Sequence, residues 1–308
     1  MEWYEAIVLG LVQGLTEFLP VSSSGHLAIG RELLGVESSG DLVFEVTLHA
    51  ATVLSTIVVF RKEIWNIIRS LFMKNGLFPG IAHPRSFNDG TDYFLKICLS
   101  MVPVFVVGVF FKDSVEAMFS SITTVAVALL CTSVLLVLSD FLPRMIADRC
   151  LVKKAAELSD EESTSADGTA SVAGLPQQET GTSARNGISW WQALVVGIGQ
   201  AVAVIPGLSR SGTTISTGLI CGMKREDVAR FSFLMVLIPI LGEAFLQIVG
   251  GEMSASSISA LPLALGFLSA FVSGLFACRV MIALVKRARL SWFALYCAVV
   301  ACMIFIFK

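Results

Sequence analysis

Two short polar segments, each at the end of an apolar stretch, hold the residues that could perform chemistry. The first runs from Gln13 to His26 and includes Glu17 and Ser23, and the second is centred on Arg210. A carboxylate, a hydroxyl and an imidazole are groups that act in proton transfer and nucleophilic attack. A guanidinium offers a planar set of donors that matches phosphate oxygens. These residue types indicate acid–base chemistry on a phosphate group.

The two segments are copies of one unit. An offset of 187 residues, without a gap, carries Gln13, Ser22, Ser24 and Gly25 onto Gln200, Ser209, Ser211 and Gly212. Such self-similarity predicts a duplicated structural unit. The copies differ where chemistry could lie, because Glu17, Ser23 and His26 face Val204, Arg210 and Thr213. We interpret this pattern as one composite site between two halves.

The composition excludes an ordinary soluble protein. Of 308 residues 55% are hydrophobic and 15% charged, and the mean hydropathy is +0.78. Apolar runs long enough to cross a bilayer lie at 42–60, 94–111, 119–142, 230–249, 260–285 and 291–307. Two shorter apolar stretches, 3–21 and 190–208, end at Pro, Gly and Ser, as expected for halves of re-entrant hairpins over 3–35 and 190–222.

These observations predict an all-α integral membrane protein built from two inverted-topology repeats. Each repeat has a re-entrant helical hairpin and three transmembrane helices. The first repeat is expected over 1–149 and the second over 190–308. Residues 150–189 begin with lysines and continue with acidic and Ser/Thr/Gly/Gln-rich sequence, which predicts a flexible cytoplasmic linker.

Loop charge predicts the orientation of the repeats. Lys and Arg cluster in the loops after the first, third and fifth expected spans and before the fourth, whereas loops 112–118 and 250–259 carry a single Lys between them. Cytoplasmic loops are the basic ones. The first hairpin then enters the membrane from outside and the second from the cytoplasm, so that their tips can meet near the middle of the bilayer.

Polar groups at membrane depth are costly, which makes these side chains candidates for function. Glu17 follows Gln13 by four residues, so the two share one helical face. Candidates for contacts with a phosphate group are Gln13, Ser22, Ser24, Ser209, Ser211, Thr213 and Thr214. Glu45 and His49 could either hydrogen-bond each other or line the cavity.

The motifs resemble those of the undecaprenyl pyrophosphate phosphatase family of bacteria, also known through bacitracin resistance. Its (E/Q)xxxE signature is similar to Gln13–Glu17, which is followed by FLPVSSSGH through His26, and its PGxSRSxxT signature is similar to Pro206–Thr214. The longer, more polar segment 150–189 departs from the usual connection of the family.

The resemblance implies hydrolysis of undecaprenyl pyrophosphate to undecaprenyl phosphate and phosphate, which recycles the lipid carrier for peptidoglycan. It also implies a bacterial inner-membrane protein with its active site toward the external face, aided by a divalent cation, Mg²⁺ or Ca²⁺. The expected partners are the lipid substrate and the bilayer, with no nucleic acid; monomer and homodimer stay open.

The expected roles follow from phosphoryl transfer, which depends on charge neutralisation and positioning. Arg210 would clamp the terminal phosphate, and Glu17 would act as general base or hold the cation. Either Ser23 or His26 could be the nucleophile, and His26 could otherwise activate Ser23 or protonate the leaving group. A rival reading is a transporter that flips polyprenyl phosphate, because broken helices in inverted repeats are typical of transporters.

Overall fold

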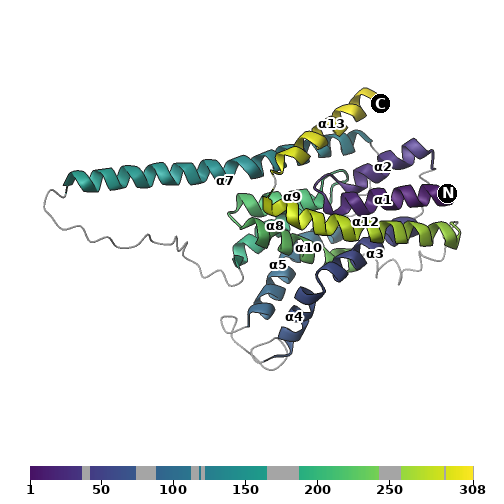
Figure 1. Cartoon of the computed structure of the whole chain (residues 1–308), viewed down its shortest axis with the longest axis horizontal. Coiled ribbons are helices and arrows are strands. Elements are labelled where there is room, and N and C mark those ends of the chain that lie inside the picture. The colour runs from purple at the N-terminus through teal and green to yellow at the C-terminus, as the bar shows by residue number, and fades with distance from the viewer. Residues whose placement is uncertain are drawn as a thin grey trace.

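The computed structural model describes residues 1–36, 42–73, 88–111, 118, 122–164, 187–242, 258–287 and 289–307. The regular structure within these ranges is helical (Figure 1). The helices are α1 (Trp3–Phe18), α2 (Ser23–Leu34), α3 (Leu42–Val59), α4 (Arg61–Leu71), α5 (Asp89–Phe110), α7 (Ile122–Thr164), α8 (Trp190–Val202), α9 (Arg210–Ile220), α10 (Arg225–Met235), α12 (Ala260–Arg287) and α13 (Ser291–Phe307). The all-helical class expected from the sequence is confirmed.

Helices α1 and α2 are joined by a short turn that the local sequence explains. Leu19 precedes Pro20 and is extended (φ −74°, ψ 145°), so α1 ends at Phe18. Ser22 has a positive φ of 70°, and its Oγ accepts a hydrogen bond from Gly25 N at 3.3 Å. This bond caps α2, which therefore begins inside the polar segment.

Helices α8 and α9 form a similar pair. α8 begins with a capping box, in which Ser189 Oγ accepts from Gln192 N and Gln192 Oε1 accepts from Ser189 N. α9 begins after Ser209, whose Oγ accepts from Gly212 N at 3.1 Å. The second helix of each pair thus starts with a serine cap at the same position of the repeated motif.

Close helix contacts at small residues hold these pairs in place. α1 packs against α12, and a Cβ at Gly14 would lie only 2.0 Å from Ser273 Oγ. α8 packs against α5, where a Cβ at Gly197 would meet the Ser100 carbonyl oxygen at 2.3 Å. Gly207, with φ +87°, lies against α7. Small residues allow this approach, as is usual between helices in membranes.

Three helical segments are long and apolar enough to cross a membrane: α5, residues Ile122–Met145 of α7, and α12. α3 and α4 meet this criterion only as a pair bent by 77°. α13 is a shorter apolar helix over Ser291–Ile306. The described residues therefore hold up to four candidate spans by length and composition, and residues 243–249 of the expected span 230–249 lie outside them. The chain is a multi-pass membrane protein.

Helix α7 differs from the expected boundary of the first unit. It continues to Thr164, past residue 150, and in Figure 1 it projects well beyond the other helices. The segment 150–164, which we expected to begin a flexible linker, is thus helical. Its Lys, Ala, Glu and Leu residues favour helix, which accounts for the difference. Of the rest of the expected linker, residues 165–186 lie outside the described residues. Residues 187–189 are described and lead into α8, with Ile188 buried and Ser189 capping the helix.

Buried ionic contacts join helices around the two pairs. Asp140 of α7 accepts hydrogen bonds from Arg225 Nη2 at 2.7 Å and from Ser291 N and Oγ at 2.9 and 2.8 Å. This contact connects α7, α10 and α13. On α5, Lys96 pairs with Asp92, and its ammonium lies 5.7 Å from the centre of the Trp190 ring on α8.

Candidate active site

The carboxylate of Glu17 is the centre of a hydrogen-bonded group on α1 and α2. Glu17 Oε2 accepts from Gln13 Nε2 at 3.0 Å, as their spacing of four residues suggests, and from Ser23 Oγ at 2.6 Å. A distance of 2.6 Å between a hydroxyl and a carboxylate is typical of a strong, charge-assisted hydrogen bond. Glu17 is therefore placed to take the proton of Ser23.

His49 of α3 extends this group. Gln13 Nε2 lies 2.9 Å from His49 Nδ1, which is itself 3.9 Å from Glu17 Oε2. An amide nitrogen can only donate, so the ring nitrogen Nδ1 accepts, and a neutral ring carries its proton on Nε2. Glu45 instead pairs with Arg31 at 2.6 Å. Of the two alternatives left open by the sequence, His49 lies beside the candidate site and does not bond Glu45.

His26 faces α13 rather than Glu17. Its Nδ1 lies 2.8 Å from the Ser22 carbonyl oxygen, so Nδ1 donates, and its Nε2 lies 2.8 Å from the Tyr296 hydroxyl. The His26 and Tyr296 rings are stacked at an angle of 10°. Among the described residues no hydrogen bond joins His26 to Ser23 or Glu17. For either ring nitrogen to attack a phosphorus atom, its hydrogen bond to Ser22 O or to the Tyr296 hydroxyl would first have to break.

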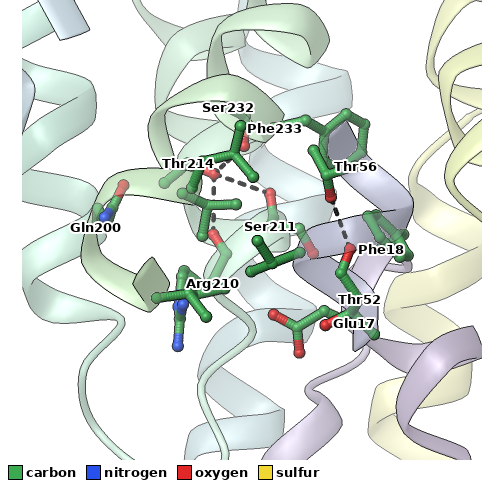
Figure 2. A pocket seen from close by; sticks show the side chains of 14 residues that line it. Glu17, Phe18, Thr52, Thr56, Gln200, Arg210, Ser211, Thr214, Ser232 and Phe233 are labelled. Carbon is green, nitrogen blue, oxygen red and sulfur yellow. Dashed lines mark hydrogen bonds between the residues drawn. The ribbon is translucent and has the colours of Figure 1, made fainter. Parts of the chain in front are cut away.

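The side chains of Arg210 and Glu17 line the same pocket. Figure 2 shows the two side chains entering the pocket from different helices, α9 and α1. Within the described part of the chain the Arg210 guanidinium forms no ion pair, so its donors are available to an anion. Arg210 is the first residue of α9, where the helix dipole and unpaired backbone N–H groups also favour negative charge.

Both polar and apolar residues line this pocket. The polar ones are Glu17, Thr52, Thr56, Gln200, Arg210, Ser211, Thr214 and Ser232. The apolar ones are Phe18, Val53, Phe233, Val236, Leu237 and Ile240. A charged group joined to a hydrocarbon chain would find complementary side chains of both kinds in this lining.

Most of the predicted serine and threonine contacts are occupied within the protein. Ser22 and Ser209 cap α2 and α9, as described above. Ser24 Oγ accepts from Gly207 N at 3.4 Å, and Ser211 Oγ donates to Leu19 O at 3.1 Å. Ser22 and Ser209 thus stabilise their own turns, whereas Ser24 and Ser211 join the two turns to each other.

The two threonines predicted to contact a phosphate differ from each other. Thr214 Oγ1 bonds Arg210 O at 2.9 Å and also contacts Ser232 Oγ of α10. Thr213 Oγ1 is buried without a partner among the described residues, and Thr213 is not one of the residues lining the pocket.

Several residues near the site were not singled out as site residues from the sequence. Thr52, Thr56 and Ser232 come from helices outside the repeated motifs, and no spacing pattern marks them. Tyr296 contacts His26 across 270 residues of sequence. The offset of the repeat, which carries Gln13 onto Gln200, was a usable signal for Gln200.

The oxygen atoms around Glu17 suit a hard divalent cation. No group of three or more His, Cys, Asp or Glu residues that could hold a metal occurs in the ranges described above. Mg²⁺, however, is commonly bound by one or two carboxylates together with substrate phosphates. Gln13 Oε1 is buried and unpartnered within the described chain, next to the Glu17 carboxylate. One carboxylate with one free amide oxygen fits this mode of binding.

The fold and the site define a multi-pass membrane protein in which a partly buried carboxylate, hydrogen-bonded to a serine, lines one pocket together with an arginine. The chain belongs to the bacitracin resistance protein BacA family, whose model matches residues 6–303.

Relatives of similar length cover nearly the whole chain. A protein of Bacteroides fragilis named undecaprenyl-diphosphatase is 44% identical over 304 residues, covering 97% of this chain and 96% of the relative. Proteins with the same name from Christiangramia forsetii and Methanobrevibacter smithii are 41% and 33% identical, covering 100% and 99% of this chain and 98% and 97% of the relatives. The family inferred from the two motifs is confirmed.

Proposed function

We propose that this protein hydrolyses undecaprenyl diphosphate to undecaprenyl phosphate and inorganic phosphate, which recycles the lipid carrier for peptidoglycan synthesis. The observation that carries the proposal is the 2.6 Å hydrogen bond from Ser23 to Glu17 beside a pocket that also receives Arg210. The names of the relatives support the same activity. The apolar side chains in the pocket lining suit the first isoprene units of the lipid.

In the proposed mechanism Ser23 is the nucleophile. Ser23 Oγ attacks the terminal phosphorus while its proton passes to Glu17 Oε2. The bond between that phosphorus and the bridging oxygen breaks, and its electron pair leaves with undecaprenyl phosphate. Water then attacks the phosphorus of the phosphoserine, the P–Oγ bond breaks, and Ser23 Oγ takes back the proton held by Glu17. Inorganic phosphate leaves with the oxygen and both protons of the water. Arg210 would stabilise the charge on the phosphoryl oxygens, where such electrostatic stabilisation contributes most to rate.

His26 is a weaker candidate for the nucleophile, because both of its ring nitrogens already have partners. We assign it to the wall of the site, where its contact with the Ser22 carbonyl supports the strained turn before Ser23. A general acid role toward the leaving phosphate would require the Tyr296 contact to open.

We propose Mg²⁺ or Ca²⁺ as the cofactor, held by the Glu17 carboxylate and Gln13 Oε1. A bound divalent cation would supply positive charge to the diphosphate oxygens. Gln13 would then have two functions, since its amide nitrogen orients Glu17 while its oxygen remains free.

The inverted-repeat architecture is also part of the proposal, with units 1–149 and 190–308, hairpins 3–35 and 190–222, and the linker between the units. The paired serine caps and the contacts of Ser24 and Ser211 across the two turns support it. In this arrangement the protein lies in the bacterial inner membrane with its site toward the external face. It could act as a monomer or a homodimer.

Phosphate release in detergent tests the proposal, because detergent micelles allow no transport between compartments. We expect the purified protein to release phosphate from undecaprenyl diphosphate, and Arg210→Ala to lose at least about 100-fold in kcat, as removal of a charge-stabilising donor does. Absence of phosphate release by the wild-type protein, with Mg²⁺ or Ca²⁺ present, would refute it. The polyprenyl-phosphate flippase alternative is not favoured, since the relatives are named as diphosphatases.

A further inference from the structure

Gln200 is a buried amide without a hydrogen-bond partner in the described part of the chain. It lies near the end of α8, its exposed fraction is 2%, and it lines the pocket that contains Glu17 and Arg210. Neither its Nε2 nor its Oε1 is hydrogen-bonded to any described residue. Burial removes the bonds that an amide makes to water, and this loss destabilises the protein unless other partners replace them.

The equivalent residue of the first repeat shows how such an amide can be used. Gln13 donates through Nε2 to both Glu17 and His49. The second repeat has Val204 at the position of Glu17, so Gln200 has no carboxylate to orient. A polar residue that the protein does not use for its own structure, and that faces the pocket, is a candidate for contact with a ligand.

The chemistry of the ligand follows from the two atoms of the amide. A carboxamide presents an N–H donor and an oxygen acceptor side by side. A partly protonated phosphate presents the complement, an unprotonated oxygen beside a hydroxyl, and it also carries the negative charge that the unpaired Arg210 guanidinium in the same pocket requires.

We propose that Gln200 is a phosphate-binding residue that makes two hydrogen bonds to the terminal phosphate. Its Nε2 donates to one phosphoryl oxygen, and its Oε1 accepts from a phosphate hydroxyl. This assignment rests on the proposed diphosphatase function. It explains why an unpartnered amide lies at the wall of the pocket. The second repeat then supplies two phosphate-binding side chains, the neutral Gln200 and the charged Arg210.

The test compares Gln200→Leu with Gln13→Leu, which make the same change at equivalent positions of the two repeats. Each variant is purified in detergent, and its thermal unfolding is measured with and without inorganic phosphate. The KM and kcat for undecaprenyl diphosphate are measured in parallel. Leu has a similar volume to Gln and carries no polar atom, so it removes the hydrogen-bonding groups and keeps the packing. Gln200→Met repeats the test with a flexible side chain.

For Gln200→Leu we expect an unchanged or higher Tm without ligand, since no bond of the resting protein is lost. We also expect at least a tenfold higher KM and loss of the Tm increase that phosphate gives the wild-type protein. Gln13→Leu should instead lower the Tm and reduce kcat, because it removes bonds to Glu17 and His49.

Two outcomes would overturn the assignment. A lower Tm of both Gln200 variants with unchanged phosphate protection would mean that the amide is bonded within the resting protein. Wild-type KM and wild-type phosphate protection in both variants would mean that the phosphate does not contact Gln200. Failure of the proposed function is recognised separately, because the wild-type protein would then release no phosphate from the lipid, whereas phosphate protection would still report on Gln200.

Discussion

Replacing Ser23 by alanine separates a nucleophilic serine from one that only orients Glu17. The substitution removes the Oγ atom that lies 2.6 Å from Glu17 Oε2. It leaves the backbone of α2 and the cap from Ser22 in place, because Ser22 Oγ bonds the Gly25 amide. The change is therefore local to the proposed reacting group.

The expected loss of rate in Ser23→Ala differs between an orienting and a nucleophilic role of Ser23. A hydrogen bond to a charged group contributes about 1.5–3 kcal/mol. At about 1.36 kcal/mol for each factor of ten in rate, loss of this bond alone would slow the reaction by roughly 10- to 150-fold. Removal of a nucleophile costs more, on the order of 1,000-fold or greater, as in other enzymes that form covalent intermediates. We expect Ser23→Ala to fall in the second range.

The assay is the initial rate of phosphate release from undecaprenyl diphosphate in detergent, with the Tm of each variant measured as a check on folding. A terminally radiolabelled substrate, quenched in acid, should leave label on Ser23 in the wild-type protein. Ser24→Ala is the matched control, since the Ser24 hydroxyl makes neutral bonds, with Gly207 N at 3.4 Å and with Ser22 Oγ at 3.3 Å. Loss of both bonds, each contributing about 0.5–1.5 kcal/mol, predicts a fall of no more than roughly 150-fold, below the range expected for a nucleophile.

A decrease of less than about 150-fold for Ser23→Ala, together with no label on the wild-type protein, would refute the nucleophilic role. Water would then be the attacking group, and Ser23 would serve to orient Glu17.

Two further substitutions test contacts around the site. Asp140→Asn should lower the free energy of unfolding by about 1.5–3 kcal/mol, because it weakens charge-assisted bonds from Arg225 and Ser291 at a side chain only 2% exposed; thermal unfolding in detergent measures this loss. Tyr296→Phe should reduce kcat by roughly 2- to 13-fold, the rate equivalent of one neutral hydrogen bond, because it frees His26 Nε2 but keeps the stacked ring; phosphate release measures it.

Each of these substitutions has a control. Glu226→Gln makes the same acid-to-amide change at an exposed pair with Arg230 and Lys286, and it should leave the Tm nearly unchanged. An equal loss of stability in both variants would contradict the role of burial at Asp140. Wild-type kcat in both Tyr296→Phe and Tyr296→Leu would show that this contact has no effect on the reaction.

The sequence predicted the features that depend on near neighbours along the chain. Gln13 and Glu17 were expected to share a helical face because they are four residues apart, and in the structure they are also hydrogen-bonded. The turn before Ser23 follows from Leu19 preceding Pro20. Local spacing decides such contacts, so they can be read without knowing how the helices pack.

Contacts between distant helices could not be predicted in the same way. His49 meets Gln13 across 36 residues and Tyr296 meets His26 across 270. Which residues meet across such distances depends on how the helices approach, and that depends on small residues such as Gly14. The sequence also could not show that the hydroxyls of Ser24 and Thr214 bond the protein backbone. A polar residue type does not reveal whether its hydrogen-bond partner is a ligand or the backbone.

In our proposal, the positions that are identical in the two repeated motifs have a different function from the positions that differ. Ser22 and Ser209 both cap a helix, and the shared residues Ser24 and Ser211 bond the opposite turn. Each motif thus helps to fix the position of the other motif's turn. If both motifs also kept the same chemical residues, the pocket would receive two carboxylates or two arginines, and like charges would repel each other. The reaction needs one base and one cation facing one phosphate. We therefore infer that the shared serines had to be kept in both copies, and that Glu17 and Arg210 had to diverge.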